Sequence, residues 1–337
     1  MTDSASPTPV AVIGCGRMGR LHARVYSEMP RAKLVGVFDV HRDKAAEVAR
    51  DYRCEPVTDL DALLPRIRAV TIAVPTQFHR EIAEPFLARG IACLIEKPLA
   101  ANTEQCRAIV ETAQEHRAVL QVGHVERFNP VIRALSRLDI QPRFIEATRI
   151  SPMTFRSIDV GVVLDMMIHD IDIVLKLAGS PVERVEATGV SVIGEVEDIC
   201  NTRVTFANGC VANLTGSRLS LKTERRLRIF SAEAYVSIDY QKKRGILVRR
   251  TGNLDAIRTA VKKVREGQLL DPTQMNFGHL IKVEEMAIED VEPLRAEQEA
   301  FLDAATGAAS PVVTGEDGLR AVELAERIVA AVGPTTL

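Results

Sequence analysis

Short apolar runs alternate with amphipathic stretches over roughly the first third of the chain. The apolar runs are Val10–Ile13, Leu34–Phe38, Ala69–Val74, Ala92–Ile95 and Val119–Val122. Continuous apolar runs are typical of parallel strands that are buried on both faces of a sheet. Apolar residues with helical spacing lie between them, as in Arg42–Asp51 and Thr103–His116. The pattern predicts a doubly wound, parallel α/β sheet over residues 1–124.

The pattern changes after Gly123, where short strands follow one another with few helices between them. The predicted strands are Arg143–Ile150, Val185–Val192, Asn201–Phe206, Gly209–Thr215, Arg226–Ser231 and Ala234–Tyr240. Ala207–Gly209 is a hairpin signal, and helical patterns at Val162–Leu177 and Leu294–Ala305 flank the strands. We therefore expect residues 125–337 to form an α+β domain with a large, mostly antiparallel sheet. The last predicted helix, Gly318–Val332, could pack on either domain.

The overall charge is nearly balanced, with 43 Lys and Arg against 45 Asp and Glu. This balance gives no reason to expect binding to nucleic acid. A local excess of fourteen basic over four acidic residues lies between Thr215 and Arg265. It is compatible with a substrate diphosphate, although a solvated basic surface explains it almost as well. Tyr240–Leu280, which overlaps this segment, is expected to be loop-rich.

The six cysteines form no CxxC pair, which predicts reduced thiols in a cytosolic protein. The polar start of the chain does not resemble a signal peptide, and no apolar run is long enough to span a bilayer. We therefore expect a cytoplasmic protein without membrane partners.

The first predicted strand runs directly into a GxGxxG motif at Gly14, Gly16 and Gly19. In the Rossmann fold, the first glycine permits a tight turn, the second lets a pyrophosphate approach the backbone, and the third lets helix and strand pack closely. The helix N-terminus then offers amide donors to the phosphates. Arg17 and Met18 lie within this loop and are expected to contact the same cofactor.

Asp39 ends the second predicted strand, twenty residues after Gly19. A carboxylate there hydrogen-bonds the adenosine ribose and repels a 2′-phosphate, which favours NAD over NADP. Arg42 weakens this preference slightly, because a nearby arginine can accept a 2′-phosphate or stack on adenine.

Two further groups carry candidate chemistry. Glu96-Lys97-Pro98 follows the fourth strand, where ligands of open α/β sheets bind; alone, it could equally be a surface salt bridge. Asp165, His169 and Asp172 have the spacing i, i+4, i+7, which predicts one polar face on an otherwise apolar helix. His169 suits proton exchange with an alcohol. The alternatives are a structural buried histidine or a divalent-metal site; we expect no metal.

The motifs together resemble the Gfo/Idh/MocA family of oxidoreductases over nearly the whole chain. They are GxGxxG, Ala73-Val-Pro-Thr-x-x-His79, Glu96-Lys97-Pro98, Asp165-x-x-x-His169-x-x-Asp172, Glu292-Pro-Leu294 with Phe301, and Gly315-Glu-Asp-Gly318. The resemblance implies that Lys97 lies at the reacting carbon, that His169 is the acid–base group and that Asp165 assists. It also implies homodimers or homotetramers that form through the C-terminal sheet.

The resemblance places further residues at the cofactor and the substrate. Thr76 and His79 would lie near the nicotinamide ribose, and Glu96 would contact the same side of the site. Val74 and Pro75 are expected to line the cofactor site, and Arg127 the substrate site.

Two runs, 123–130 and 163–172, resemble a bacterial branch of UDP-N-acetylglucosamine 3-dehydrogenases, which act on the lipid A precursor pathway. We therefore expect NAD-dependent oxidation of a nucleotide sugar. The alternatives are a free polyol or sugar dehydrogenase of the inositol 2-dehydrogenase type and an NAD-dependent glycosidase. A non-enzymatic NAD-binding regulator would leave Lys97 and His169 without a purpose.

Overall fold

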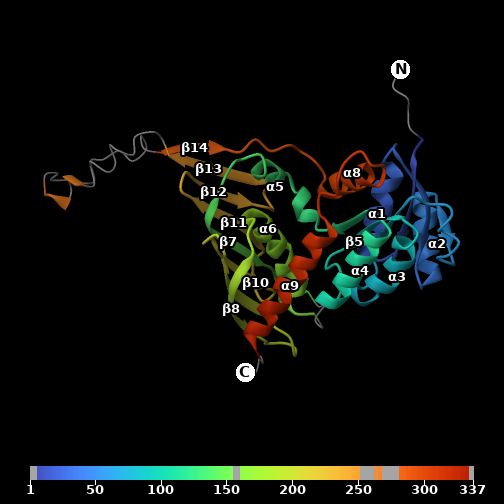
Figure 1. Ribbon diagram of the computed structural model, residues 1–337, viewed down its shortest axis with the longest axis horizontal. Coiled ribbons are helices and arrows are strands. Elements are labelled where there is room, and N and C mark those ends of the chain that lie inside the picture. Colours follow the sequence, from blue (N-terminus) through green and yellow to red (C-terminus); the bar gives the residue numbers. More distant parts are fainter. Residues whose placement is uncertain (1–5, 155–159, 251–261, 264, 268–280, 334–337) are drawn as a thin grey trace, which may run out of the picture. The chain divides into compact units, whose positions relative to one another are not determined.

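The computed structural model describes residues 6–154, 160–250, 262–263, 265–267 and 281–333 (Figure 1). The described chain divides into two compact units that interleave along the sequence. The first unit takes the residues up to Asn129, then Val163–Leu175 and Val291–Ala330. The second unit takes Pro130–Val162, Lys176–Asp290 and the last residues from Ala331.

The first unit contains a six-stranded parallel sheet in the order β3-β2-β1-β4-β5-β6. The strands are β1 (Thr8–Ile13), β2 (Ala32–Phe38), β3 (Glu55–Val57), β4 (Ala69–Ile72), β5 (Ala92–Glu96) and β6 (Leu120–Gly123). This is the strand order of a doubly wound dinucleotide-binding sheet. The predicted α/β fold is confirmed.

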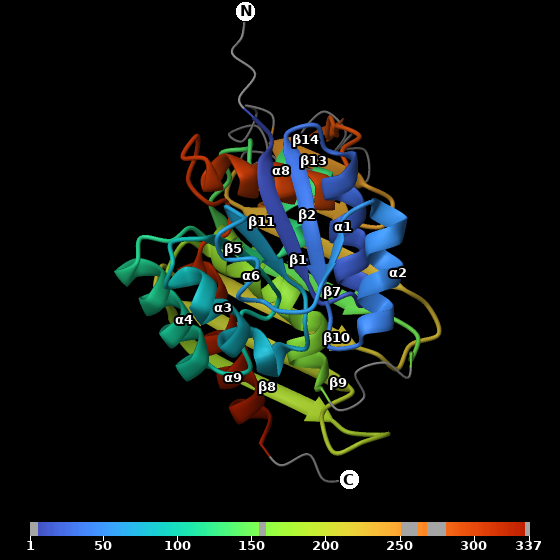
Figure 2. The ribbon, with the colours of Figure 1, turned by 90° about the vertical axis from the view of Figure 1, so that its right-hand side faces the viewer.

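Helices cover both faces of this sheet (Figure 2). They are α1 (Arg17–Glu28), α2 (Arg42–Tyr52), α3 (His79–Leu87), α4 (Thr103–Glu115), α8 (Pro293–Ala305) and α9 (Gly315–Val332). The first unit also holds most of α6 (Ile168–Ala178) and the short elements η1 (Thr76–Phe78), η2 (Val125–Phe128) and η3 (Val163–Met167). Residues of α1, α2 and α8 share one buried cluster with the sheet, and those of α3 and α4 share the other. Each fully buried Val, Leu or Ile contributes about 1.5–3 kcal/mol.

Local capping and ion pairs fix the late helices in the first unit. Thr314 and Asp317 cap each other's backbone amides at 3.1 Å where α9 begins, the arrangement of a capping box. Ion pairs link α8 to α1 and to the loop that follows α1: Arg295–Glu28 at 3.6 Å and Arg31–Asp303 at 2.7 Å. The last predicted helix therefore packs largely in the first unit, and Gly318 lies against Val122 of β6.

The second unit is built around an eight-stranded sheet in the order β14-β13-β12-β11-β7-β10-β9-β8. The elements are α5 (Pro130–Leu135), β7 (Pro142–Ile150), β8 (Val182–Val190), β9 (Ile199–Phe206), β10 (Val211–Ser217), β11 (Glu224–Ser231), β12 (Ala234–Asp239), β13 (Arg244–Arg250) and β14 (Ile281–Glu285). Only β7 and β10 pair in parallel. The prediction of a large, mostly antiparallel sheet is confirmed.

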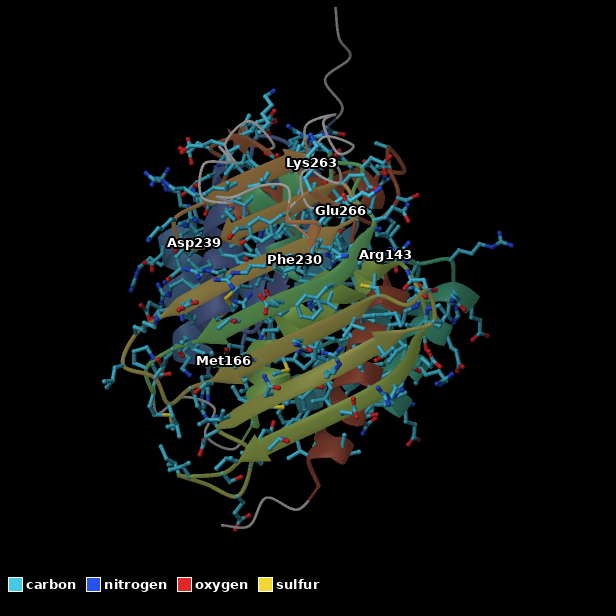
Figure 3. The ribbon with its side chains drawn as sticks, turned by 90° about the vertical axis from the view of Figure 1, so that its left-hand side faces the viewer. Arg143, Met166, Phe230, Asp239, Lys263 and Glu266 are labelled. Atoms are coloured by element: carbon cyan, nitrogen blue, oxygen red, sulfur yellow. The ribbon has the colours of Figure 1, made fainter. Side chains whose placement is uncertain are left out.

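The strands of this sheet alternate between a buried and an open face. On β11, Leu227 and Ile229 are buried, whereas Phe230 is 36% exposed. Phe230 and Arg143 are labelled on the sheet in Figure 3.

The prediction that Tyr240–Leu280 is loop-rich was wrong for Arg244–Arg250, which forms β13. In this strand, buried Gly245 and Leu247 alternate with exposed residues. The charged residues on either side obscured that pattern in the sequence. Residues 251–261, 264 and 268–280 lie outside the described residues. No helix among the described residues is long and apolar enough to cross a membrane.

Candidate active site

The glycines of the β1–α1 loop have the geometry of a dinucleotide site. Gly14 has a φ of +93°, and a side chain there would meet the carbonyl oxygen of Ala73 at 2.4 Å. A Cβ on Gly19 would come within 1.6 Å of the carbonyl oxygen of Gly14. A Cβ on Gly16 would meet nothing within 4 Å, and no side chain caps α1 at this residue. The loop therefore leaves its open side and the helix N-terminus for a pyrophosphate, so the residues present fit NAD.

Asp39 is held by the backbone of this same loop. Its Oδ2 accepts a hydrogen bond from the Cys15 amide at 2.7 Å, and its Oδ1 accepts one from the His41 amide at 2.8 Å. A carboxylate has about four acceptor positions, so the partly exposed group keeps some for ribose hydroxyls. Arg17 and Arg42 are exposed beside the loop, and Met18 is half-buried.

The loop after β4 carries the residues expected near the nicotinamide ribose. Pro75 is exposed, and Val74 and Thr76 are half-buried. His79 is 1% exposed, with Nδ1 3.0 Å from the Pro98 carbonyl and Nε2 3.0 Å from the Val74 carbonyl. Burial lowers the pKa of His79 below its ordinary value. His79 therefore links the β4 loop to the segment that carries Lys97.

Lys97 meets the predicted acid–base segment within the first unit. Its Nζ donates a hydrogen bond to the backbone carbonyl of Asp165 at 2.7 Å and lies 4.0 Å from Oδ1 of the same residue. The Lys97 side chain is 18% exposed, so it is held but still accessible. The contact of Lys97 Nζ with the Asp165 carbonyl is therefore closer than its contact with the Asp165 carboxylate.

The acid–base segment is not one regular helix. Val163–Met167 forms a wider π-type turn before α6 begins at Ile168. Such turns recur at functional sites. Asp165 lies in this turn, whereas half-buried His169 lies in the first turn of α6. The regular i, i+4, i+7 spacing therefore does not describe this segment.

Asp172 forms a buried ion pair with Arg127. The guanidinium Nε and Nη2 donate to the two carboxylate oxygens at 2.6 and 2.7 Å, and the side chains are 6% and 1% exposed. The pair joins η2, which follows β6, to α6. Arg127 was expected to bind the substrate; its geometry favours a role in positioning α6. Asp165, His169 and Asp172 do not form a group of three with the spacing of metal ligands.

Glu96 faces away from Lys97 Nζ and into the interior. Its Oε1 lies 2.8 Å from Nε2 of His22, and its Oε2 accepts the Lys97 backbone amide at 3.3 Å. Burial alone would raise the pKa of Glu96, but the hydrogen bond from His22 and the charge of Lys97 hold that pKa below its ordinary value.

Sequence reasoning missed the group behind Glu96: His22, Glu297 and Gln298 are each 0% exposed. A signal was present in α8, because positions 297 and 298 fall between buried Leu294 and buried Phe301 at helical spacing. Polar residues at such core positions are costly unless they are paired or used.

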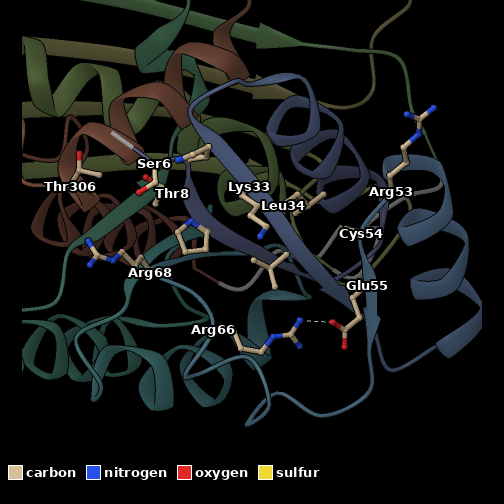
Figure 4. Close-up of a pocket in the computed structure, with 13 residues that line it drawn as sticks. Ser6, Thr8, Lys33, Leu34, Arg53, Cys54, Glu55, Arg66, Arg68 and Thr306 are labelled. Carbon is tan, nitrogen blue, oxygen red and sulfur yellow. Dashed lines mark hydrogen bonds and ion pairs between the residues drawn. The ribbon is translucent and has the colours of Figure 1, made fainter. Parts of the chain in front are cut away.

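A separate hollow of about 1250 Å³ lies at the opposite end of the strands, where β1 and β2 begin (Figure 4). Lys33, Arg53, Arg66 and Arg68 are among its lining residues, and Arg66 pairs with Glu55 at 2.5 Å. Ligands of doubly wound sheets bind at the carboxyl ends of the strands, so this hollow is not the candidate active site.

The described basic residues between Thr215 and Arg265 are spread over several strands and turns. Several have acidic partners, as in Arg228–Glu146 at 3.4 Å and Lys222–Glu224 at 2.9 Å. Arg218 is deeply buried among them: its Nε donates to Asp198 at 2.6 Å, and its side chain is 5% exposed. All six cysteines are free thiols.

The fold, the glycine loop and Asp39 define an NAD-dependent oxidoreductase that acts on CH–OH groups. Comparison with known families agrees: residues 8–124 match the oxidoreductase family with an NAD-binding Rossmann fold, and residues 143–237 match the GFO/IDH/MocA C-terminal domain. The chain belongs to the Gfo/Idh/MocA family.

Several relatives are named as dehydrogenases. The chain is 41% identical over 230 residues to UDP-N-acetylglucosamine 3-dehydrogenase of Acidithiobacillus ferrooxidans, covering 68% of this chain and 73% of that protein. A solved structure of that enzyme superposes with a TM-score of 0.86 at 34% identity, covering 97% of this chain and 98% of the other. Inositol 2-dehydrogenase of Rhizobium meliloti is 27% identical over 95% of this chain and 96% of its own length.

Proposed function

We propose that this protein oxidises the 3-hydroxyl of UDP-N-acetylglucosamine to a ketone with NAD, as a step toward a lipid A precursor. The observation that carries the proposal is the contact of Lys97 Nζ with Asp165 at the carboxyl end of β5. It brings the two predicted catalytic segments together in the unit that holds the cofactor loop. The 41% identity to a dehydrogenase of this substrate favours the nucleotide sugar.

Bound NAD supplies a hydride acceptor. The chain's own residues then account for the rest of the reaction. As the C–H bond breaks toward the cofactor, the hydroxyl proton must leave, so that a carbonyl forms. His169 takes this proton. Lys97 donates a hydrogen bond to the hydroxyl oxygen and stabilises the negative charge that develops there.

Other residues hold these two groups in place. The Asp165 carbonyl and carboxylate fix Lys97 Nζ, while the Arg127–Asp172 pair fixes α6, and thereby His169. Thr76, His79, Val74 and Pro75 form the loop expected on the nicotinamide side. In the alternative assignment, Lys97 takes the proton and His169 stabilises the charge on the oxygen.

The basic residues between Thr215 and Arg265 are proposed to bind a diphosphate. Their fourteen-to-four excess supports this assignment. It also agrees with the strong hydrogen bonds that guanidinium groups make to phosphates.

We also propose that two copies of the chain pair through the open face of the eight-stranded sheet. An apolar row crosses that face in register: Val211, Phe144, Phe230, Tyr235, Val248 and Val283. The Phe144–Phe230 ring centroids are 5.7 Å apart, and Val283 is 60% exposed. Exposed apolar rows of this kind mark interaction surfaces. The proposed location is the cytoplasm, where the six free thiols would stay reduced.

A second candidate is a polyol dehydrogenase, because the inositol 2-dehydrogenase match spans nearly the whole chain. One assay distinguishes the nucleotide-sugar dehydrogenase from the polyol dehydrogenase. It measures NADH formation with UDP-N-acetylglucosamine, other UDP-sugars and free inositols. The proposal expects turnover with the first. Turnover only with inositols, or hydrolysis of a glycoside without net NADH, would replace it. Thermal protection by UDP alone tests the diphosphate site, since a ligand that binds only the native state raises its stability.

A further inference from the structure

A buried polar cluster lies behind Lys97 on the α1 and α8 face of the parallel sheet. One ligand-type atom from each of His22, Glu96 and Glu297 lies within 4.8 Å of the other two. Gln298 and Gln121 border the same group: Gln298 Nε2 lies 2.9 Å from His22 Nδ1, and Gln121 Nε2 donates to the Glu297 backbone carbonyl at 3.1 Å.

The hydrogen bonds assign the state of His22. Gln298 Nε2 also donates to the His22 carbonyl at 3.1 Å, and a carbonyl can only accept, so the amide orientation is fixed. The same NH₂ group therefore donates to Nδ1 of His22. His22 then carries its single proton on Nε2 and donates it to Glu96 Oε1 at 2.8 Å. His22 is thus a neutral ring that supports Glu96 as a carboxylate.

Glu297 has no such support. It is 0% exposed, and neither carboxyl oxygen has a hydrogen-bond partner among the described residues. Gln121 Oε1 and Gln298 Oε1 are likewise acceptors without a partner there. The cluster therefore has acceptors in excess and lacks a donor. A proton on Glu297 supplies a donor and removes a charge that nothing nearby compensates.

We propose that Glu297 is a neutral acid that leaves Glu96 as the single buried carboxylate behind Lys97, and that loss of the Glu297 proton limits turnover at high pH. Glu297 is a positioning residue in this scheme, which rests on the proposed role of Lys97. A second carboxylate charge behind Lys97 opposes the negative charge that develops on the substrate oxygen. The reaction therefore slows as Glu297 ionises.

The elements packed around Glu297 carry few competing charges. Burial and the nearby Glu96 raise the pKa of Glu297 well above its ordinary value. On α1, Tyr26 donates or accepts a hydrogen bond with Thr71 of β4 at 2.9 Å. The turn η2 packs on α8 and carries Glu126, bonded to Asn129, and Arg127, paired with Asp172. His124 lies near Glu96 and is kept neutral by burial, which lowers its pKa.

The test compares the wild-type protein with Glu297→Gln and, as a control on the same helix, Glu299→Gln, which changes a partly exposed carboxylate. The first readout is the melting temperature against pH. An acid whose pKa is raised by folding stabilises the folded state below its unfolded pKa, and this contribution is lost as the pH rises. As the pH rises above about 4.3, the ordinary pKa of a glutamate, the wild type and Glu299→Gln should lose melting temperature, and Glu297→Gln should lose less.

The second readout is kcat against pH in the direction of alcohol oxidation. Glu297→Gln should keep kcat within about threefold at its optimum but move the alkaline decline to higher pH. An infrared band of a protonated carboxyl group at neutral pH should be present in the wild type and reduced in Glu297→Gln. Parallel melting curves with no difference in this band would overturn the proposal, as would a stoichiometric divalent metal that Glu297→Gln alone loses. The melting curves and the infrared band need no substrate, so they test the protonation of Glu297 even if the proposed substrate is wrong. If Glu297 proves to be neutral but the alkaline decline of kcat does not shift in Glu297→Gln, then Glu297 does not act on Lys97 as proposed.

Discussion

Replacing Asp172 by Asn removes one charge from the buried pair while leaving its shape nearly unchanged. The pair has two hydrogen bonds of 2.6 and 2.7 Å, and its side chains are 1% and 6% exposed, so solvent screening is small. Breaking a buried pair on one side costs about 3–5 kcal/mol, and Asp317, whose Oδ1 lies 3.9 Å from Arg127 Nη2, compensates only part of the charge left behind. With an unfolding entropy of about 2.1 cal/mol/K per residue, a chain of 337 residues that unfolds as one should lose ~4–7 °C in melting temperature.

The assay is calorimetry at pH 7 together with steady-state turnover. Glu289→Gln is the control, because Glu289 forms a 2.7 Å pair with Arg137 that is more than half exposed, and its loss should leave the melting temperature unchanged. Asp172→Asn should also lower kcat, since His169 lies one turn earlier in α6. A melting temperature within about 1 °C of the wild type would refute the reasoning that this pair is buried and only partly compensated when broken.

The remaining predictions concern the cofactor, the chemistry and pH. Lys97→Ala and His169→Ala should each lower kcat at least about a hundredfold while NADH binding, measured by fluorescence, stays nearly intact; near-normal turnover in both would end the assignment. Asp39→Ala should narrow the preference for NADH over NADPH in binding titrations, and a wild-type protein that binds NADPH more tightly would contradict the role of Asp39. Burial lowers the pKa of His124, so the unfolded chain binds more protons below about pH 6.5 and stability falls there by up to ~1.4 kcal/mol per pH unit. His124→Gln should flatten this acid slope in denaturant titrations, and an unchanged slope would assign it to other groups.

Local patterns were sufficient for the parallel sheet and the cofactor loop. The strands of the first unit are buried on both faces, so their apolar runs are continuous, and the glycines act through contacts within a few residues or with the adjacent strand. Lys97 was recognisable because it follows a strand at the edge where ligands bind. The contact between Lys97 and Asp165 followed from the expectation that both segments serve one site.

Long-range pairing was beyond this kind of reasoning. Arg127 looked available to a substrate because nothing in the adjacent sequence showed that Asp172, forty-five residues later, would occupy it. The π-type turn at Val163–Met167 left no mark in the spacing of polar residues. Glu297 was visible as a polar residue at a core position, but His22, which lies near it in the fold, is at the other end of the chain. Charged residues around Gly245 and Leu247 concealed β13.

The interleaving of the first unit bears on how the protein is made. A ribosome releases β1 to β6 long before α8, although His22 of α1 is bonded to Gln298 across 276 positions. Until α8 emerges, Tyr26, Leu94 and the other residues of its buried cluster lack the cover that Phe301 and Leu302 provide. The nascent sheet therefore exposes an apolar face until α8 is synthesised, and such a state is prone to aggregation. A fragment that stops after β6 is released in that same state, so the cofactor-binding region is not expected to be expressible alone.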